Sequence, residues 1–456
     1  MKVFLQFFNK KTTMDYNNFI KLTKFISISI LILAFSSSSF AQNTIPISLS
    51  EAKANAKENN TNLKISEQDY AIAKANYNQT RAVLLPKISV SNTSIATNNP
   101  LNAFGFKLLQ KTVSSPDFNP DLLNDPGKVE NFNTKIDVQQ PLINVDGWKA
   151  RKAANLQMHA ADLQKERSAD YLDLEVEKTY MELQLAYKSV DVTKKALETV
   201  NENQKIAKNS LDQGLIQNAD YLNVEVRVTE VKNQLQYAES NVQNVSDYLA
   251  FLLGAETTET YVPNEELSIV ASEIDFGSKL NSDRNDIKAF EYNVDAQTQM
   301  MKSSKLSFVP RANAFGSYEW NDDEFMGFTA DNYIVGLQLS WDIFNGGKNL
   351  GKVHYEKAQL EKVNLSKDNY IAKSKIELNK AKRQLKDAEN NVTLSKLALE
   401  QSEESLRIKT DRFEQGLEKT TDLLFVETQY QQKELAYYQS IFNYNYALAY
   451  LNFLTK

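Results

Sequence analysis

The sequence predicts a mainly α-helical protein that carries four β-strands and is built from two copies of one structural unit. One observation is a proline-free stretch from about Gly347 to Phe413, in which apolar residues recur every seven positions. A second is that many short motifs recur about 202 residues further along the chain. A third is that a pair of alternating apolar and polar segments precedes each long helix. A helix over the whole proline-free stretch would span roughly 100 Å at about 1.5 Å per residue, and no ordinary globular core requires a helix of that length.

The seven-residue spacing identifies the face that each long helix buries. Apolar residues seven positions apart, with a second row of mostly small residues, form a coiled-coil seam that lets neighbouring helices approach closely. The rows are Leu378, Leu385, Val392, Leu399, Leu406 and Phe413 with Ala381, Ala388, Ser395, Ser402 and Lys409 in the later helix, and Val176, Leu183, Val190, Leu197, Gln204 and Leu211 with Thr179, Ala186, Thr193, Val200 and Ala207 in the earlier one.

Composition and charge exclude several classes of function. The chain has 456 residues, a formal net charge of −6 and no cysteine. The net negative charge argues against nucleic acid as a partner, and the missing cysteines exclude disulfides, thiolate metal sites and a lipidated N-terminal cysteine. Only His159 and His354 could serve as a metal ligand or general base of the imidazole type. No nucleophile–base or metal-ligand pattern stands out, so the sequence predicts no enzyme, no cofactor and no metal site.

Residues 1–41 have the pattern of a secretory signal peptide. Lys21 and Lys24 precede the apolar run Phe25–Phe35, and Ser39-Phe40-Ala41 resembles a cleavage site. The apolar run is shorter than the roughly 20 residues that span a bilayer. The alternative is an N-terminal anchor helix. The rest of the chain has no other long apolar run, so it would have to cross a membrane as β-strands.

The internal repeat divides the rest of the chain into residues 42–254, a linker over 255–281, and residues 282–456. Each copy is expected to hold a helix, a β-hairpin, a long helix and a shorter returning helix. The first copy would begin with a helix from an N-cap at Ser50 to about Leu84, and the second with a helix from Ser282 or Asp283 to about Ser307. The matching motifs are Leu85-Pro86-Lys87 with Val309-Pro310-Arg311, Leu142-Ile143-Asn144 with Ile343-Phe344-Asn345, Gln213-Gly214-Leu215 with Gln415-Gly416-Leu417, and Tyr248-Leu249 with Tyr450-Leu451.

Four segments of about ten residues alternate in polarity, as membrane-spanning β-strands do. The stretches between the paired strands, residues 99–131 and 321–331, are expected to be hairpin loops. The alternative is a soluble sheet with one wet face. The second and fourth strands carry the pattern best, with Phe132, Thr134, Ile136 and Val138 opposed to Asn133, Lys135, Asp137 and Gln139, and with Tyr333, Val335, Leu337, Leu339 and Trp341 opposed to Asn332, Ile334, Gly336, Gln338 and Ser340.

Four strands cannot close a barrel, because about eight are the practical minimum, and open edges in lipid would leave backbone groups unpaired. Several chains must therefore pool their strands. Subunits arranged around an axis would form a hollow barrel continued by a cylinder of helices, which is a conduit.

The duplicated order of these motifs, with Ile-Phe-Asn-Gly-Gly at the second strand-to-helix junction and Gln-Gly-Leu at both helix tips, resembles the TolC-type outer-membrane efflux family from about Ile47 to Leu454. The resemblance implies a homotrimer with a twelve-stranded β-barrel in outer-membrane lipid and a helical tunnel through the periplasm. It implies the outer-membrane channel of a tripartite efflux or type I secretion system, which docks onto a periplasmic adaptor fed by an inner-membrane pump. The alternative function is a secreted structural coiled-coil protein or adhesin without a pore.

The resemblance also implies roles for residues at the helix tips. Gly214, Leu215, Gly416 and Leu417 occupy the tip positions that relatives present to the adaptor, and they also fit a glycine C-cap with a packing leucine. Asp422 aligns with an aspartate that constricts the periplasmic aperture in relatives. The next acidic position of the family is Phe425 here, which allows an apolar constriction. Asp220 is the repeat mate of Asp422 and could equally cap a helix.

Overall fold

The computed structural model describes residues 44–256, 259–271 and 279–456, and the predicted signal peptide lies outside them. The described chain is mostly helical. In order, its elements are β1 (Thr44–Ile47), α2 (Leu49–Asn59), α3 (Thr61–Gln79), the 3-10 turn η1 (Thr80–Val83), β2 (Lys87–Thr97), α4 (Pro100–Leu109), η2 (Ser115–Phe118), α5 (Pro120–Asn124), β3 (Val129–Ile143), α6 (Val145–Asp212), α7 (Asn218–Leu253), β4 (Thr260–Pro263), α8 (Asn285–Leu306), β5 (Arg311–Asp322), β6 (Ala330–Ser340), α9 (Lys348–Glu414) and α10 (Thr420–Thr455).

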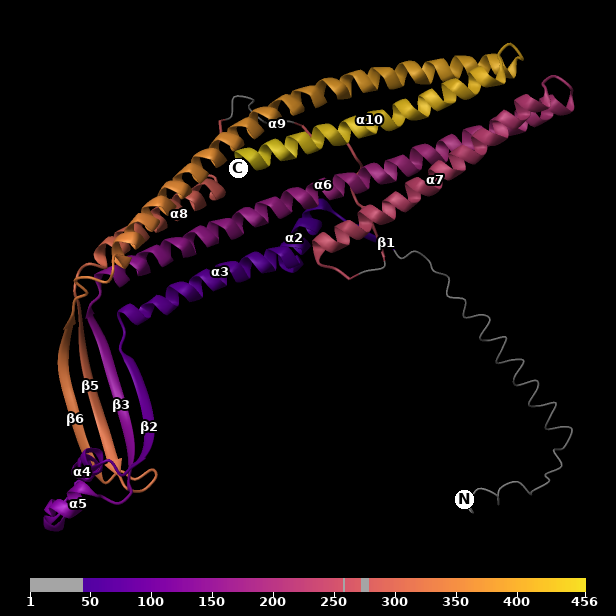
Figure 1. Cartoon of the computed structure of the whole chain (residues 1–456). Helices are drawn as coiled ribbons and strands as arrows, with labels where there is room; N and C mark the ends of the chain where they lie inside the picture. The colour runs from indigo at the N-terminus through magenta and orange to yellow at the C-terminus, as the bar shows by residue number, and fades with distance from the viewer. Residues whose placement is uncertain (1–43, 257–258, 272–278) are drawn as a thin grey trace, which may run out of the picture.

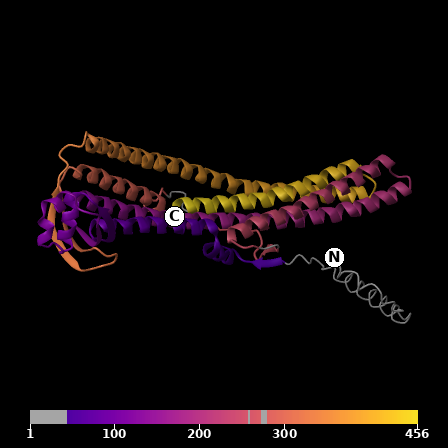
Figure 2. The same ribbon diagram turned by 60° about the horizontal axis from the view of Figure 1, so that its bottom comes forward.

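The molecule is elongated (Figure 1). The sheet lies at one end, and the loops that join α6 to α7 and α9 to α10 lie at the other. The turned view in Figure 2 also places the α6–α7 and α9–α10 turns together at the end far from the strands. Helices α6 and α9 run the full length of the body, whereas α3 and α8 cover its half near the sheet and α7 and α10 cover the other half. Among the described residues, none of the helices combines the length and the apolar character that crossing a bilayer requires.

The predicted coiled-coil seams are confirmed. Leu378, Leu385 and Val392 of α9 are buried against α10, and Ala381 in the second row is also buried. In α6, the row from Thr179 to Ala207 is fully buried, as are the large members of the first row near the middle of the helix. Close packing along these seams is what holds such long helices side by side, since helix propensity alone contributes little to their stability.

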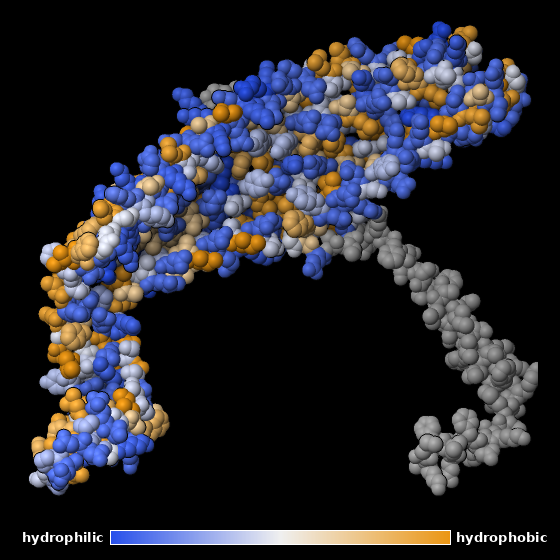
Figure 3. Space-filling model, viewed as in Figure 1, coloured by the Kyte–Doolittle hydropathy of each residue, from blue (hydrophilic) through white to orange (hydrophobic). Residues whose placement is uncertain are grey.

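The four predicted strands are confirmed as one antiparallel sheet in the order β2-β3-β5-β6. The register places most apolar positions of the four strands on one face, because Ile136 pairs with Val90 and Tyr318, and Tyr318 pairs with Tyr333. The exceptions on the other face include Ile95, Phe315 and Ile334. Lys135 pairs with Ser91 and Glu319 on the opposite, polar face. Figure 3 shows hydrophobic residues gathered along the strand region and hydrophilic residues over much of the helical body.

The first predicted helix is wrong in two details. It begins after Ser48 rather than Ser50, because Ser48 and Glu51 form a reciprocal capping box. It is also broken at Asn60, whose side chain accepts a hydrogen bond from the Leu63 amide and donates one to the Leu252 carbonyl. This buried amide ends α2, caps α3 and ties both to the end of α7.

Two further predictions need correction. Helix α8 is capped by neither Ser282 nor Asp283, because its N-cap is Arg284, whose buried side chain pairs with Asp286. Residues 99–131 are not a plain hairpin loop, since they form α4, η2 and α5. Asn99 caps α4 with Pro100 at its first position, and Gln110 then donates to the Glu130 carbonyl and the Asn131 side chain. The Asn-Pro start was the signal of this helix.

Candidate helix-tip site and tunnel aperture

The two helix tips are built in the same way. Gly214 has φ +72° and Gly416 has φ +69°, in the left-handed region that glycine adopts without strain. The Leu215 amide donates to the Ser210 carbonyl at 2.8 Å, and the Leu417 amide donates to the Arg412 carbonyl at 2.9 Å. These bonds satisfy carbonyls at the ends of α6 and α9, so the predicted glycine C-caps are confirmed.

The leucine after each tip glycine does not pack into the helices. Leu215 is 71% exposed and Leu417 is 62% exposed, at the extreme end of the molecule. An added Cβ at either tip glycine would meet no atom within 4 Å. The tips therefore present apolar side chains to the surroundings, and the backbone conformation rather than crowding selects glycine there.

The two tips differ in charge. In the second tip, the Glu418 carboxylate pairs with Lys409 at 2.9 Å and Arg412 at 3.0 Å. The hydrogen bond from Lys409 is the main reason why the pKa of Glu418 falls to about 2. The position that corresponds to Glu418 in the first tip is Ile216. Ion pairs thus fasten the second tip to the last two turns of α9, whereas the first tip has no charge at this position.

The predicted aperture residues occupy the first two turns of the returning helices. Asp422 is exposed at the third position of α10, and Phe425, one turn further, is 63% exposed. Their spacing of three places both side chains on one face. Asp220 instead accepts a hydrogen bond from the Gln217 amide at 3.2 Å, in the capping box of α7. The structure therefore brings Asp422 and Phe425 together and gives Asp220 a local structural bond.

A buried polar cluster behind the tips was not predicted from the sequence. It joins the two helical hairpins: Asn203 of α6 donates to Glu427 of α10, and Arg227 of α7 donates to Gln431 of α10 at 2.8 Å. All four residues are at most 6% exposed. Burial raises the pKa of Glu427 to about 7, against the opposing effects of Arg227 and the Asn203 hydrogen bond. The sequence held one signal of this cluster: Glu427 follows the apolar Leu423 by four residues, so a charged residue lies on the same helix face as an apolar one.

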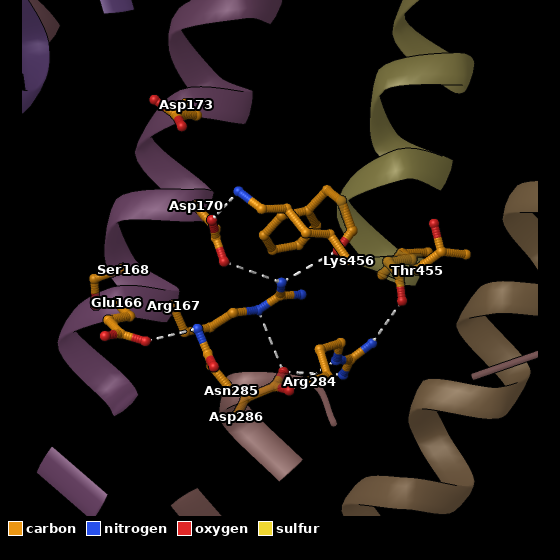
Figure 4. Close-up of polar contacts among 12 residues, drawn as sticks. Glu166, Arg167, Ser168, Asp170, Asp173, Arg284, Asn285, Asp286, Thr455 and Lys456 are labelled. Atoms are coloured by element: carbon orange, nitrogen blue, oxygen red, sulfur yellow. Dashed lines mark hydrogen bonds and ion pairs between the residues drawn. The ribbon is translucent and has the colours of Figure 1, made fainter. Parts of the chain in front are cut away.

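A second buried cluster lies halfway along the body, where α8 begins and α10 ends (Figure 4). Arg284 pairs with Asp286 at 2.7 Å and donates to the Leu454 carbonyl at 3.1 Å. Arg167 of α6 lies 3.4 Å from Asp286 and donates to the Phe453 carbonyl at 3.2 Å. The hydrogen bonds of Asp286, mainly with Arg284, hold the pKa of its carboxyl below the usual range despite burial. The cluster fixes α6, α8 and α10 to one another.

The described residues contain no group of three or more His, Asp or Glu side chains placed to hold a metal ion. What the arrangement offers is exposed tips, an acidic and an aromatic residue on one face behind them, and a sheet with one apolar face. These are features of a transport or assembly protein.

The sequence matches the family model described as outer membrane efflux protein over residues 54–255 and 277–454. This match covers most of the chain, which therefore belongs to the outer membrane efflux protein family. The protein is located in the outer membrane and functions in efflux. A comparison with curated protein sequences finds no match.

Several solved structures share the fold. The Campylobacter jejuni CmeC outer membrane channel has a TM-score of 0.79 and 14% identity, with 89% of this chain and 85% of that chain covered. A membrane protein from Pseudomonas aeruginosa has a TM-score of 0.76 and 18% identity, with 89% and 90% covered. The outer membrane protein VceC from Vibrio cholerae has a TM-score of 0.73 and 16% identity, with 89% and 96% covered.

The buried Glu427 predicts an unusual pH dependence. The pKa of Glu427 is raised from 4.5 to about 7, so the folded state keeps a proton that the unfolded state has lost between these values. The free energy of unfolding should therefore fall by about 3 kcal/mol as the pH rises from about 4.5 to 7, and it should keep this lower value above pH 7. Glu427→Gln should raise the melting temperature in detergent at pH 8 and leave it unchanged at pH 5. Glu230→Gln, at an exposed partner of Arg227, is the matched control. Equal melting temperatures of wild type and Glu427→Gln at pH 8 would contradict the prediction.

Proposed function

We propose that the chain is the outer-membrane channel of a tripartite efflux or type I secretion system and provides a passive exit duct for drugs or other solutes. The observation that carries the proposal is the sheet, which has one apolar and one polar face and two open edges, β2 and β6. In lipid such edges would leave backbone groups unpaired at a cost of several kcal/mol each. The family match gives no support to a secreted coiled-coil protein or adhesin, and the family is one of channels rather than of catalysts.

A homotrimer resolves the open edges. Three copies of the four-stranded sheet supply twelve strands, enough to close a barrel with an apolar outside and a polar lumen. The long helices then continue the barrel as a tunnel through the periplasm. We further propose that residues 42–254 and 282–456 are copies of one unit joined by 255–281. The near-equal lengths of α6 and α9, at 68 and 67 residues, and of α7 and α10, at 36 residues each, support this division.

The assembly is tested by native mass measurement and by planar-bilayer recording of the protein extracted from outer membranes. A trimer of the mature chain that forms long-lived channels is the expected result, because only pooled strands close the barrel. A monomer that stays soluble without detergent, or a trimer without conductance, would overturn the proposal.

The tips are proposed to dock onto a periplasmic adaptor protein that is fed by an inner-membrane pump. Leu215 and Leu417 would supply apolar contacts, and the left-handed glycines would hold these leucines outward. The support is their exposure at the end of the body opposite the sheet.

Replacement of Gly416 by aspartate should abolish export while the barrel still assembles. Asp and Asn both tolerate the left-handed conformation better than other side chains, so Gly416→Asn is a control with similar backbone strain and no charge. We expect Gly416→Asp to lose cross-linking to the adaptor and drug resistance in cells, and Gly416→Asn to retain most of both. Undiminished adaptor cross-linking in Gly416→Asp would count against docking through this tip.

The aperture is proposed to be a mixed gate near the tips. In a trimer each residue occurs three times around the axis, so three Asp422 carboxylates would attract cations and three Phe425 rings would exclude water. The exposure of both side chains on one face of α10 supports this role. Asp220 is the second candidate for the gate, because its carboxylate already accepts a hydrogen bond from the Gln217 amide.

Phe425→Ala should raise the resting conductance severalfold, because it removes the apolar block. Asp422→Asn should lower cation selectivity with little change in conductance. Asp411→Asn, an exposed carboxylate on α9 that pairs with Arg407, serves as the control for a general change in charge. Single-channel recordings in which both aperture variants match the wild type would place the constriction elsewhere in the tunnel.

A further inference from the structure

A large groove lies beside residues 164–175 in the first half of α6, a region to which the proposed function assigns no role. It has a volume of about 780 Å³. One wall is formed where α2 passes into α3 beside the end of α7, and the other where α8 begins beside α9 and the end of α10. Seven of its lining residues are aromatic, namely Tyr171, Tyr248, Phe251, Phe290, Tyr370, Tyr450 and Phe453.

The groove opens on the face of α6 that is opposite to α2. Helix α2 is fixed to α6 by the ion pairs Lys53–Glu177 at 2.6 Å and Lys57–Asp173 at 2.8 Å. Tyr171 and Glu175 are each two residues from Asp173, which is about 200° around the helix. Three copies of α2 with the β1–β4 sheet would obstruct the bore of a tunnel, so they belong on its outside. The groove then lines the inside, and this step rests on the proposed trimeric channel.

Several rings in the groove have free faces. Tyr171 is 54% exposed, Tyr248 is 45% exposed and Phe251 is 59% exposed. Tyr248 stacks on Phe251 with 6.1 Å between ring centroids, and Tyr171 meets Phe453 edge to face at 6.1 Å. The partly buried rings of Tyr450 and Phe453 line the α10 side of the groove. A flat ligand could therefore lie between the exposed rings of α6 and α7 and the rings of α10.

The charges of the groove favour a cation. At its floor, Arg167 and Arg284 are buried and engaged by Asp286 and by main-chain carbonyls (Figure 4). Nearer its opening lie the carboxylates of Glu175 and Glu377, and Glu377 accepts a hydrogen bond from the Tyr450 hydroxyl. Within the described part of the chain, neither Glu175 nor Glu377 has a lysine or arginine nitrogen at ion-pair distance. These two carboxylates therefore keep negative charge that a cationic ligand could pair with.

We propose that this groove is a binding site for aromatic organic cations on their way through the tunnel. The π faces of Tyr171, Tyr248 and Phe251 attract a cation, and the carboxylates of Glu175 and Glu377 complement its charge. The size suits a ligand of a few fused rings, since small-molecule sites span about 300–1,000 Å³. The site would concentrate such solutes near the middle of the tunnel wall.

The test measures binding of the fluorescent cation ethidium to the purified trimer by fluorescence polarisation, with anilinonaphthalene sulfonate as an aromatic anion. Ethidium should bind and the anion should bind at least tenfold more weakly. Phe251→Ala and Glu175→Gln should each weaken ethidium binding roughly fivefold, within the range of cation–π and charge contacts. Tyr237→Ala, an exposed aromatic on α7 outside the groove, should leave binding unchanged.

Equal binding of the anion, or unchanged affinity in both groove variants, would overturn the proposal and would point to non-specific uptake by apolar surface or detergent. Native mass and single-channel conductance are recorded on the same preparations. A conducting trimer that does not bind ethidium refutes the groove site alone, whereas loss of the trimer itself refutes the proposed channel on which the site rests.

Discussion

The pairing of backbone groups is the constraint on which the other features depend. Each strand of the sheet contributes N–H and C=O groups that lipid cannot satisfy, and the single chain leaves both β2 and β6 unpaired along one edge. A soluble sheet would solve the problem with charged or short edges, but β6 carries Val335, Leu337 and Leu339 on its apolar face, each more than 70% exposed. In the proposed trimer, the chain supplies one part of a closed wall. Once the strands are closed around an axis, the helices that follow β3 and β6 are forced to start on the same circle and to pack as a tube.

The packing of the helical body within one chain depends mainly on α6. It contacts α3 and α8 in one half of the body and α7 and α10 in the other, so two shorter helices in succession lie along each side of it. The ends of these shorter helices are where the continuous seam is interrupted, and buried polar groups take over there. Asn60 ties α2 and α3 to α7, and the Arg167–Asp286–Arg284 cluster ties α6 to α8 and α10. The aromatic groove lies at this same level of the body, because helix ends leave space that continuous helices would fill.

Much of this architecture could be predicted from the sequence, because long helices and strands leave periodic patterns of apolar residues. A seven-residue period fixed the buried rows of α6 and α9, and a two-residue period fixed the faces of the strands, because both depend on local geometry alone. The tip glycines followed from the need for a left-handed residue. The break at Asn60 and the start of α8 at Arg284 could not be found in this way, since each depends on a partner about 190 or 170 residues away. The same holds for Glu427, whose partners Asn203 and Arg227 become neighbours only after the two hairpins pack.

The buried polar clusters also answer a question that the seams leave open. A seam with a seven-residue period can slide by one heptad and still bury apolar residues, so apolar packing alone sets the register of two long helices weakly. A buried polar group that loses its hydrogen-bond partner costs about 1–3 kcal/mol, and more where the group is charged, which exceeds the loss of one apolar contact. Sliding α10 along α6 by one heptad would separate Glu427 from Asn203 near the tips and the Phe453 and Leu454 carbonyls from Arg167 and Arg284 at the middle. Two polar clusters far apart along one helix therefore fix its register at both ends. We infer that they keep the two tips level with each other, as the proposed docking of both hairpins onto one partner would require.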